Sequence, residues 1–299
     1  MSRVVAALAL AAVSQVPLPP NAAPAAGTVS VYGWVENLQG KPTASVKATD
    51  FEALVDGIRV PIKAVVPPRT TASIVLLLDT SRSAGWTPRP LDDQLGLFAS
   101  SLDPKDRLMI ATFGGRATAA AFRPAGEDIR GAVRRLLELE DDEGYGNSPV
   151  WDAIHGAVAV LSEQPVPRSV VLLTDGRATG NRYGLADVAG YAVGNGVALN
   201  VVLKHSMQMI SQSGGTAALV QPGAPIQELA NYTGGMYFTY PERQEDRIRE
   251  IFTLIASAAD TTLGFTFAVS TLDGSPHRLD IRSARTDLTV HAPSAFVAR

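Results

Sequence analysis

Two unbroken apolar runs, each leading into an aspartate, constrain the fold of this chain more than any other feature. Residues 74–78 read Ile-Val-Leu-Leu-Leu and precede Asp79, while residues 170–173 read Val-Val-Leu-Leu and lead through Thr174 into Asp175. A run without polar alternation is typical of a strand buried on both faces, as in a parallel sheet covered by helices. Both aspartates should then reach the carboxyl edge of one sheet.

Residues 71–258 alternate between helical and strand patterns, as a helix-covered parallel sheet requires. Apolar residues recur at helical spacing in six segments, which are 91–102, 127–139, 149–161, 185–192, 226–232 and 244–258. Further strands are expected at 108–113, 199–203 and 236–238, with an edge hairpin at 117–122. We therefore predict an α/β fold over residues 71–258, with a doubly wound, mostly parallel sheet.

The segments on either side, 28–68 and 260–299, follow the two-residue period of half-buried strands. Hairpin turns are expected at Asp56-Gly57 and at Asp273-Gly274. Each segment is too short to bury a sheet face alone. We therefore expect the two segments to pack together as one small β-sandwich-like domain, into which the α/β domain is inserted.

The N-terminal residues suggest export. Residues 1–14 combine the basic Arg3, an alanine-rich apolar run and small residues at positions 12 and 14, a pattern typical of a cleaved signal peptide. A buried first helix is the alternative, but the proline-rich residues 15–27 favour a linker. No later stretch reaches the roughly 20 apolar residues that span a bilayer. We expect a secreted or periplasmic protein without a transmembrane segment.

Composition excludes several kinds of site. The 299 residues include no cysteine, so disulfides, zinc–thiolate sites and cysteine nucleophiles are absent. The four histidines are scattered and lack metal-ligand spacing. A formal net charge of −3 gives no electrostatic argument for nucleic acid as a partner. Any bound metal must therefore be held mostly by oxygen atoms.

Asp79 and Asp175 should meet in the crevice where open α/β sheets bind ligands. Two close carboxylates repel each other unless a cation or a proton lies between them. Ser81 and Ser83 follow Asp79 and add neutral hydroxyl oxygens. Such a set suits a hard divalent cation, and Mg²⁺ prefers about six oxygens, several of them from water.

The pattern resembles a known family. Residues 79–83, Asp-Thr-Ser-Arg-Ser, match the DxSxS signature of the metal-ion-dependent adhesion site in von Willebrand factor type A domains. Residues 106–113 resemble the family's second strand, 146–152 the start of its third helix, and 174–176 its TDG turn. These motifs stand in the family's order, and the resemblance covers roughly residues 71–257.

The resemblance implies a site and a function. The metal would be bound by five side chains, Asp79, Ser81, Ser83, Ser148 and Asp175, with Mg²⁺ expected and Mn²⁺ or Ca²⁺ possible ions. An acidic side chain, Asp or Glu, of a protein partner would take the last position, as in cell adhesion, and no catalysis is implied. Ser148 stands where the family has threonine, and a serine before Pro149 is alternatively a helix N-cap.

A second resemblance concerns the flanks. Residues 50–57 read DFEALVDG and are similar to a DFxxxxDG segment found ahead of this domain in a group of secreted bacterial von Willebrand A-related proteins. The strands expected over 263–290 are also similar to that group. This resemblance says more about the domain architecture of the chain than about its function.

Loops at the carboxyl edge would select the partner. They are 84–90, 140–147, 177–183 and the long 204–225, for which a binding loop and a disordered surface loop are equal alternatives. The acidic run 140–143 reads as solvated surface, and a second cation site is the alternative.

Two other functions compete with partner binding. A metal-dependent hydrolase is conceivable because a metal with an open position can activate water, but GxSxG, HExxH and phosphate-binding motifs are absent, and His155 reads as a surface or packing residue. The other is a structural or assembly protein of the cell envelope whose metal site is vestigial. A hydrolase assay with Mg²⁺, Mn²⁺ and Zn²⁺ tests the first alternative. Asp79→Ala tests the second, because it should abolish partner capture by a metal-dependent binding module and leave capture intact if the metal site is vestigial.

Overall fold

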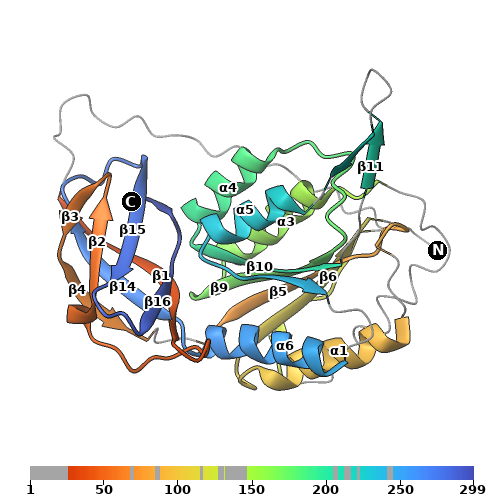
Figure 1. Cartoon of the computed structure of the whole chain (residues 1–299), viewed down its shortest axis with the longest axis horizontal. Coiled ribbons are helices and arrows are strands. Elements are labelled where there is room, and N and C mark those ends of the chain that lie inside the picture. The colour runs from red at the N-terminus through yellow and green to blue at the C-terminus, as the bar shows by residue number, and fades with distance from the viewer. Residues whose placement is uncertain are drawn as a thin grey trace, which may run out of the picture.

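The computed structural model describes residues 26–67, 71–84, 88–114, 117–126, 131, 147–204, 208–211, 217–220, 223–240 and 245–299. Within these ranges the chain forms an α/β lobe and a β-sandwich lobe, which lie side by side (Figure 1). The expected signal peptide 1–14, most of the linker 15–27, the acidic run 140–143 and the expected helix 127–139, apart from Gly131, lie outside the described residues.

The α/β lobe is built on a seven-stranded sheet in the order β13-β10-β9-β5-β6-β7, with β8 also paired to β6. The parallel strands are β5 (Ser73–Asp79), β6 (Arg107–Phe113), β9 (Arg168–Thr174), β10 (Val197–Lys204) and β13 (Tyr237–Tyr240). The short β7 (Thr118–Ala119) and β8 (Arg123–Pro124) pair antiparallel with β6. The order of connection reverses between β5 and β9, so a topological switch point lies at their carboxyl ends.

Helices cover both faces of this sheet, which explains the unbroken apolar runs (Figure 1). One face packs against α1 (Pro88–Ser101) and α6 (Glu245–Asp260), through a cluster that includes Leu76, Phe98 and Phe252. The other face packs against α3 (Val150–Ser162), α4 (Leu185–Gly194) and α5 (Ala224–Tyr232), through a cluster that includes Val75 and Leu172. Successive side chains of β5 therefore enter opposite cores, and the predicted α/β fold is confirmed.

The sandwich lobe has two four-stranded sheets, ordered β16-β1-β14-β4 and β17-β15-β2-β3. N-terminal strands are β1 (Gly27–Asn37), β2 (Phe51–Val55), β3 (Ile58–Val60) and β4 (Ile62–Val66), with the 3-10 turn η1 (Ala48–Asp50) before β2. C-terminal strands are β14 (Leu263–Val269), β15 (Pro276–Ser283), β16 (Leu288–His291) and β17 (Ala295–Val297). Both sheets pair strands from the two ends of the chain, as in β1 with β14 and β2 with β15.

Some local expectations differ from the structure. The segment after the expected Asp56-Gly57 turn does not continue as one strand: it divides at Pro61, which lacks the N–H that a continuing ladder needs. The turn at Asp273-Gly274 joins strands of different sheets rather than a hairpin. β1 already begins at Gly27, inside the expected linker. The expected loop 204–225 contains a hairpin of β11 (Gln208–Ser211) and β12 (Ala217–Val220).

The helices of the described part are all too short or too polar to cross a membrane.

Candidate metal-binding site

The candidate residues come from three segments that meet at the switch point. Asp79 is the last residue of β5, and Ser81 and Ser83 lie in the turn that follows it. Asp175 comes directly after β9, the neighbouring parallel strand, where Leu78 pairs with Leu173. Ser148 lies just before α3. Because parallel strands end at the same edge of the sheet, both carboxylates lie at its carboxyl edge.

Asp79 is the centre of the cluster and is 0% exposed. Its Oδ1 accepts a hydrogen bond from the Ser81 backbone N–H at 3.0 Å. Its Oδ2 accepts from the Thr174 hydroxyl at 2.6 Å and from the Ser148 hydroxyl at 3.1 Å. The buried carboxylate therefore holds the ends of β5 and β9 and the start of α3 together.

Burial raises the pKa of Asp79 above its usual value, because a buried carboxylate loses its hydration. Hydrogen bonds from Ser81 and Thr174 act in the opposite direction by favouring the charged form. The negative charge of Asp175 raises the pKa further. Positive charge placed between Asp79 and Asp175 would therefore be strongly stabilising.

Asp175 is 1% exposed and is held by the residue two positions later. Its Oδ1 accepts from the Arg177 backbone N–H at 3.0 Å, and its Oδ2 lies 3.5 Å from Arg177 Nε. The Arg177 side chain is 36% exposed, so it brings a positive charge to the rim of the site.

The two serines of the turn complete the oxygen set. The Ser81 hydroxyl lies 3.2 Å from the Ser83 hydroxyl, within hydrogen-bonding distance. Ser81 is buried and Ser83 is exposed, so the turn leads from the buried carboxylate to the surface.

Ser148 does not cap α3, because its hydroxyl donates to Asp79 and the helix has no side-chain cap at its N-cap residue. Asn181 supplies the capping interaction instead, since its Oδ1 accepts from the Trp151 backbone N–H at 2.7 Å. Thr179 holds Ser148 from the same segment, accepting from its N–H at 2.9 Å and donating its own N–H to the Ser148 carbonyl at 2.8 Å. The segment after the TDG turn thus directs the Ser148 hydroxyl toward Asp79.

Several residues of the site were missed by sequence reasoning. Thr174 was read as part of the TDG turn, but not as a donor to Asp79. Gly114 follows β6 with a φ of +100°, and a Cβ there would lie 2.6 Å from Ser81 N and 2.9 Å from Asp79 Oδ1. The Gly114-Gly115 pair was the available signal, because glycine is favoured where backbone must approach closely.

The donor set is two carboxylates and three hydroxyls, and the described residues contain no cluster of three or more His, Cys, Asp or Glu side chains suited to a metal. Hydroxyl and carboxylate oxygens fit a hard cation such as Mg²⁺, which keeps part of its water. His155 stacks between Tyr183 and Tyr191, with ring centroids 3.9 and 4.3 Å apart, so it serves packing.

Residues 74–177 match the family model of the von Willebrand factor type A domain, and all five candidate ligands lie within that range. No curated protein matches the chain.

Many solved structures are similar to the chain. A von Willebrand factor type A protein from Catenulispora acidiphila is 10% identical, with 94% of this chain and 75% of that chain covered and a TM-score of 0.50. An aerotolerance-related membrane protein from Bacteroides fragilis is 18% identical, covering 62% and 98%, at 0.45. Mussel byssus proximal thread matrix protein 1, with a zinc-occupied MIDAS motif, is 16% identical, covering 67% and 48%, at 0.46.

Proposed function

Since this chain carries a von Willebrand factor type A domain, we propose that it is a metal-ion-dependent protein-binding module that captures an acidic side chain of a partner. The observation that carries this proposal is the buried Asp79 carboxylate, on which Ser81, Ser148 and Thr174 converge beside Asp175. Burying two carboxylates next to each other at a sheet edge costs free energy unless a positive charge compensates them.

Asp79, Ser81, Ser83, Ser148 and Asp175 would hold the ion, which we expect to be Mg²⁺. When bound, it would supply an open position for one carboxylate oxygen of the partner. The chain's own residues contribute preorganisation, because the hydrogen bonds of Asp79 and the Thr179–Ser148 pair hold the oxygens in place. The partly exposed side chain of Arg177 adds a positive charge that favours the same acidic partner.

The surfaces beside the site support a protein partner. β10 ends at the carboxyl edge, and the β11–β12 hairpin follows it within a few residues (Figure 1). Among the described strands, this hairpin pairs with no other sheet. Its two edges therefore offer backbone groups that an extended segment of the partner can bind.

Metal binding is tested first, by isothermal titration of the full chain with Mg²⁺ and with Mn²⁺. We expect one saturable site in the wild type and a loss of affinity of at least about tenfold, or 1.4 kcal/mol, in Asp79→Asn. Asp246→Asn, an exposed change on α6, is the matched control and should bind as the wild type does. Equal binding by all three proteins would refute the metal site.

Partner capture is tested with immobilised chain and an envelope fraction, in Mg²⁺ and in EDTA. A partner retained only with Mg²⁺, and lost with Asp79→Ala, would support the proposal. Capture that survives both EDTA and Asp79→Ala would instead favour an envelope assembly protein with a vestigial metal site. Hydrolysis of model esters or phosphoesters that depends on Asp79 and on added metal would contradict the view that the site binds without catalysing.

Localisation outside the cytoplasm is part of the same proposal, and it rests on residues 1–14. Expression of the full chain in a bacterium, followed by mass spectrometry of the N-terminus in each cell fraction, tests it. A protein that keeps Met1 and stays in the cytoplasm would refute it.

A further inference from the structure

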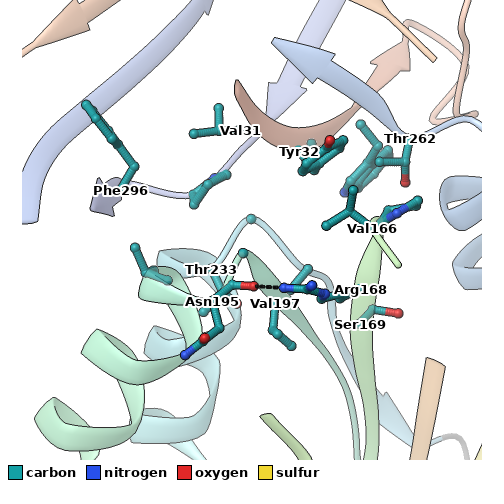
Figure 2. Close-up of a pocket in the computed structure, with 18 of the residues that line it drawn as sticks. Val31, Tyr32, Val166, Arg168, Ser169, Asn195, Val197, Thr233, Thr262 and Phe296 are labelled. Atoms are coloured by element: carbon teal, nitrogen blue, oxygen red, sulfur yellow. Dashed lines mark hydrogen bonds between the residues drawn. The ribbon is translucent and has the colours of Figure 1, made fainter. Parts of the chain in front are cut away.

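A cavity of about 250 Å³ lies between the two lobes (Figure 2). Arg168 and Val197 line it, and they are the first residues of β9 and β10. The cavity is therefore at the amino edge of the sheet, and Asp79 is at the carboxyl edge. β1, Pro293 and residues 295–297 of the sandwich lobe form the opposite wall.

The walls are mostly apolar. Side chains from both lobes contribute, among them Val31, Val197, Ile255 and Phe296. The nearby hydroxyls of Thr233 and Thr262 already donate to backbone carbonyls of Leu229 and Ala258, at 3.0 and 2.9 Å. These walls suit the hydrocarbon part of a ligand better than a polar body, because most of their surface is apolar and the two threonine hydroxyls are already satisfied within the protein.

Arg168 is the exception, a partly buried cation that reaches along the cavity toward Asn195 (Figure 2). Its Nε donates to the Gln164 carbonyl at 2.7 Å and its Nη1 to the Asn195 carbonyl at 2.9 Å. Burial lowers the pKa of Arg168, and Tyr32 acts in the opposite direction. No carboxylate among the described residues contributes to this balance. The guanidinium thus has carbonyl partners but no counter-charge in the described part of the chain.

We propose that this cavity binds a small organic monoanion with an aliphatic chain, a carboxylate of medium length. The carboxylate contacts Arg168, which supplies the missing charge pairing, and the chain lies against Val31, Val197 and Ile255. A charge-assisted bond in a partly desolvated cavity is stronger than one at the surface, and the apolar walls add the burial of methylene groups. Such a ligand touches both lobes and stabilises their contact.

Isothermal titration of the full chain with octanoate, and with octanol as a neutral probe of similar length, tests the proposal. We expect octanoate to bind with one-to-one stoichiometry and octanol to bind at least about tenfold more weakly. Arg168→Gln should remove the difference between the two probes. Arg247→Gln, an exposed change on α6 of equal charge, should leave both affinities unchanged.

Arg168 also holds two backbone carbonyls, so its loss can weaken the fold itself. Ala259→Phe keeps Arg168 and fills the cavity, because Ala259 is a lining residue on α6. It should abolish octanoate binding while circular dichroism reports a folded protein.

Three results would each overturn the proposal. In the first, octanoate and octanol bind the wild type equally, or neither binds at millimolar concentration. In the second, Arg247→Gln loses as much affinity for octanoate as Arg168→Gln does. In the third, Ala259→Phe still binds octanoate. The cavity and the Asp79 cluster lie at opposite edges of the sheet, so these results leave the metal-site tests unaffected.

Discussion

Gly114→Ala probes how closely the backbone after β6 must approach the Asp79 cluster. The added Cβ would lie 2.6 Å from Ser81 N, 2.8 Å from Ser81 Cβ and 2.9 Å from Asp79 Oδ1, all below the 3.0 Å that real contacts respect. The φ of +100° also lies outside the regions open to alanine. Backbone strain of this kind costs roughly 1–3 kcal/mol, and overpacking a dense site costs a similar amount.

The matched control is Gly196→Ala, in the same lobe. Gly196 has a φ of +61°, and nothing lies within 4 Å of its added Cβ. It should therefore lose only the ~1–2 kcal/mol of the left-handed conformation. We expect Gly114→Ala to lose about 2–5 kcal/mol in total, because it adds a clash to a comparable strain.

Urea unfolding followed by circular dichroism measures the stability of both variants, and a Mn²⁺ titration measures their affinity at the proposed metal site. Gly114→Ala should bind Mn²⁺ at least about tenfold more weakly than the wild type, while Gly196→Ala should bind it normally. The reasoning is refuted if the two variants are equally stable and Gly114→Ala keeps its metal affinity.

Three further predictions concern other residues. Burial raises the pKa of Asp106 from 3.8 to about 6, so stability should fall as pH rises from about 4 to 6, by on the order of 3 kcal/mol. Asp106→Asn keeps an acceptor for Ala72 N and should abolish this fall in urea unfolding at several pH values. Hydrogen bonds to Asp56 and Asp273 raise the pKa of His277 above 6.5. The protonated His277 therefore stabilises the fold fully below pH 6.5, and this stabilisation is lost as the pH rises through the raised pKa. An NMR titration of the imidazole that gives an ordinary pKa would contradict the prediction. Asn181→Ala should cost about 1 kcal/mol in thermal unfolding and weaken metal binding, because Trp151 N loses its acceptor and the start of α3 loosens; unchanged metal affinity would show that Ser148 needs no support from that segment.

Much of the α/β lobe could be predicted because its signals are local. The apolar runs of β5 and β9 indicate two-sided burial by themselves, and the position of Asp79 and Asp175 after those runs places both carboxylates at one edge. The DxSxS turn is also contiguous in the chain.

What could not be predicted depends on distant partners. Ser148 could either cap its own helix or bind Asp79. Asn181, which lies in another segment, accepts the hydrogen bond at the start of the helix, and the Ser148 hydroxyl therefore donates to Asp79. The division at Pro61 and the placement of β15 opposite β14 depend on how two sheets share strands, which the two-residue period does not specify. The cavity beside Arg168 arises only when the lobes pack, so no contiguous pattern marks it.

The insertion of one lobe within the other has a consequence for the order of folding. Val29 pairs with Phe267 and Ala53 with Ile281, so strands made early in synthesis meet their partners only after the whole α/β lobe has been made. Closing so long a loop from an open chain is slow. A folded α/β lobe makes this pairing faster, because it holds its two ends close together. Asp106 accepts a hydrogen bond from Ala72 N near the first end, and the charge of Asp260 at the second end acts on the same carboxylate. We therefore expect β4 and β14 to join only once that lobe has formed. Until then β1, β4 and one edge of the β2–β3 hairpin are unpaired during synthesis and can pair with other chains.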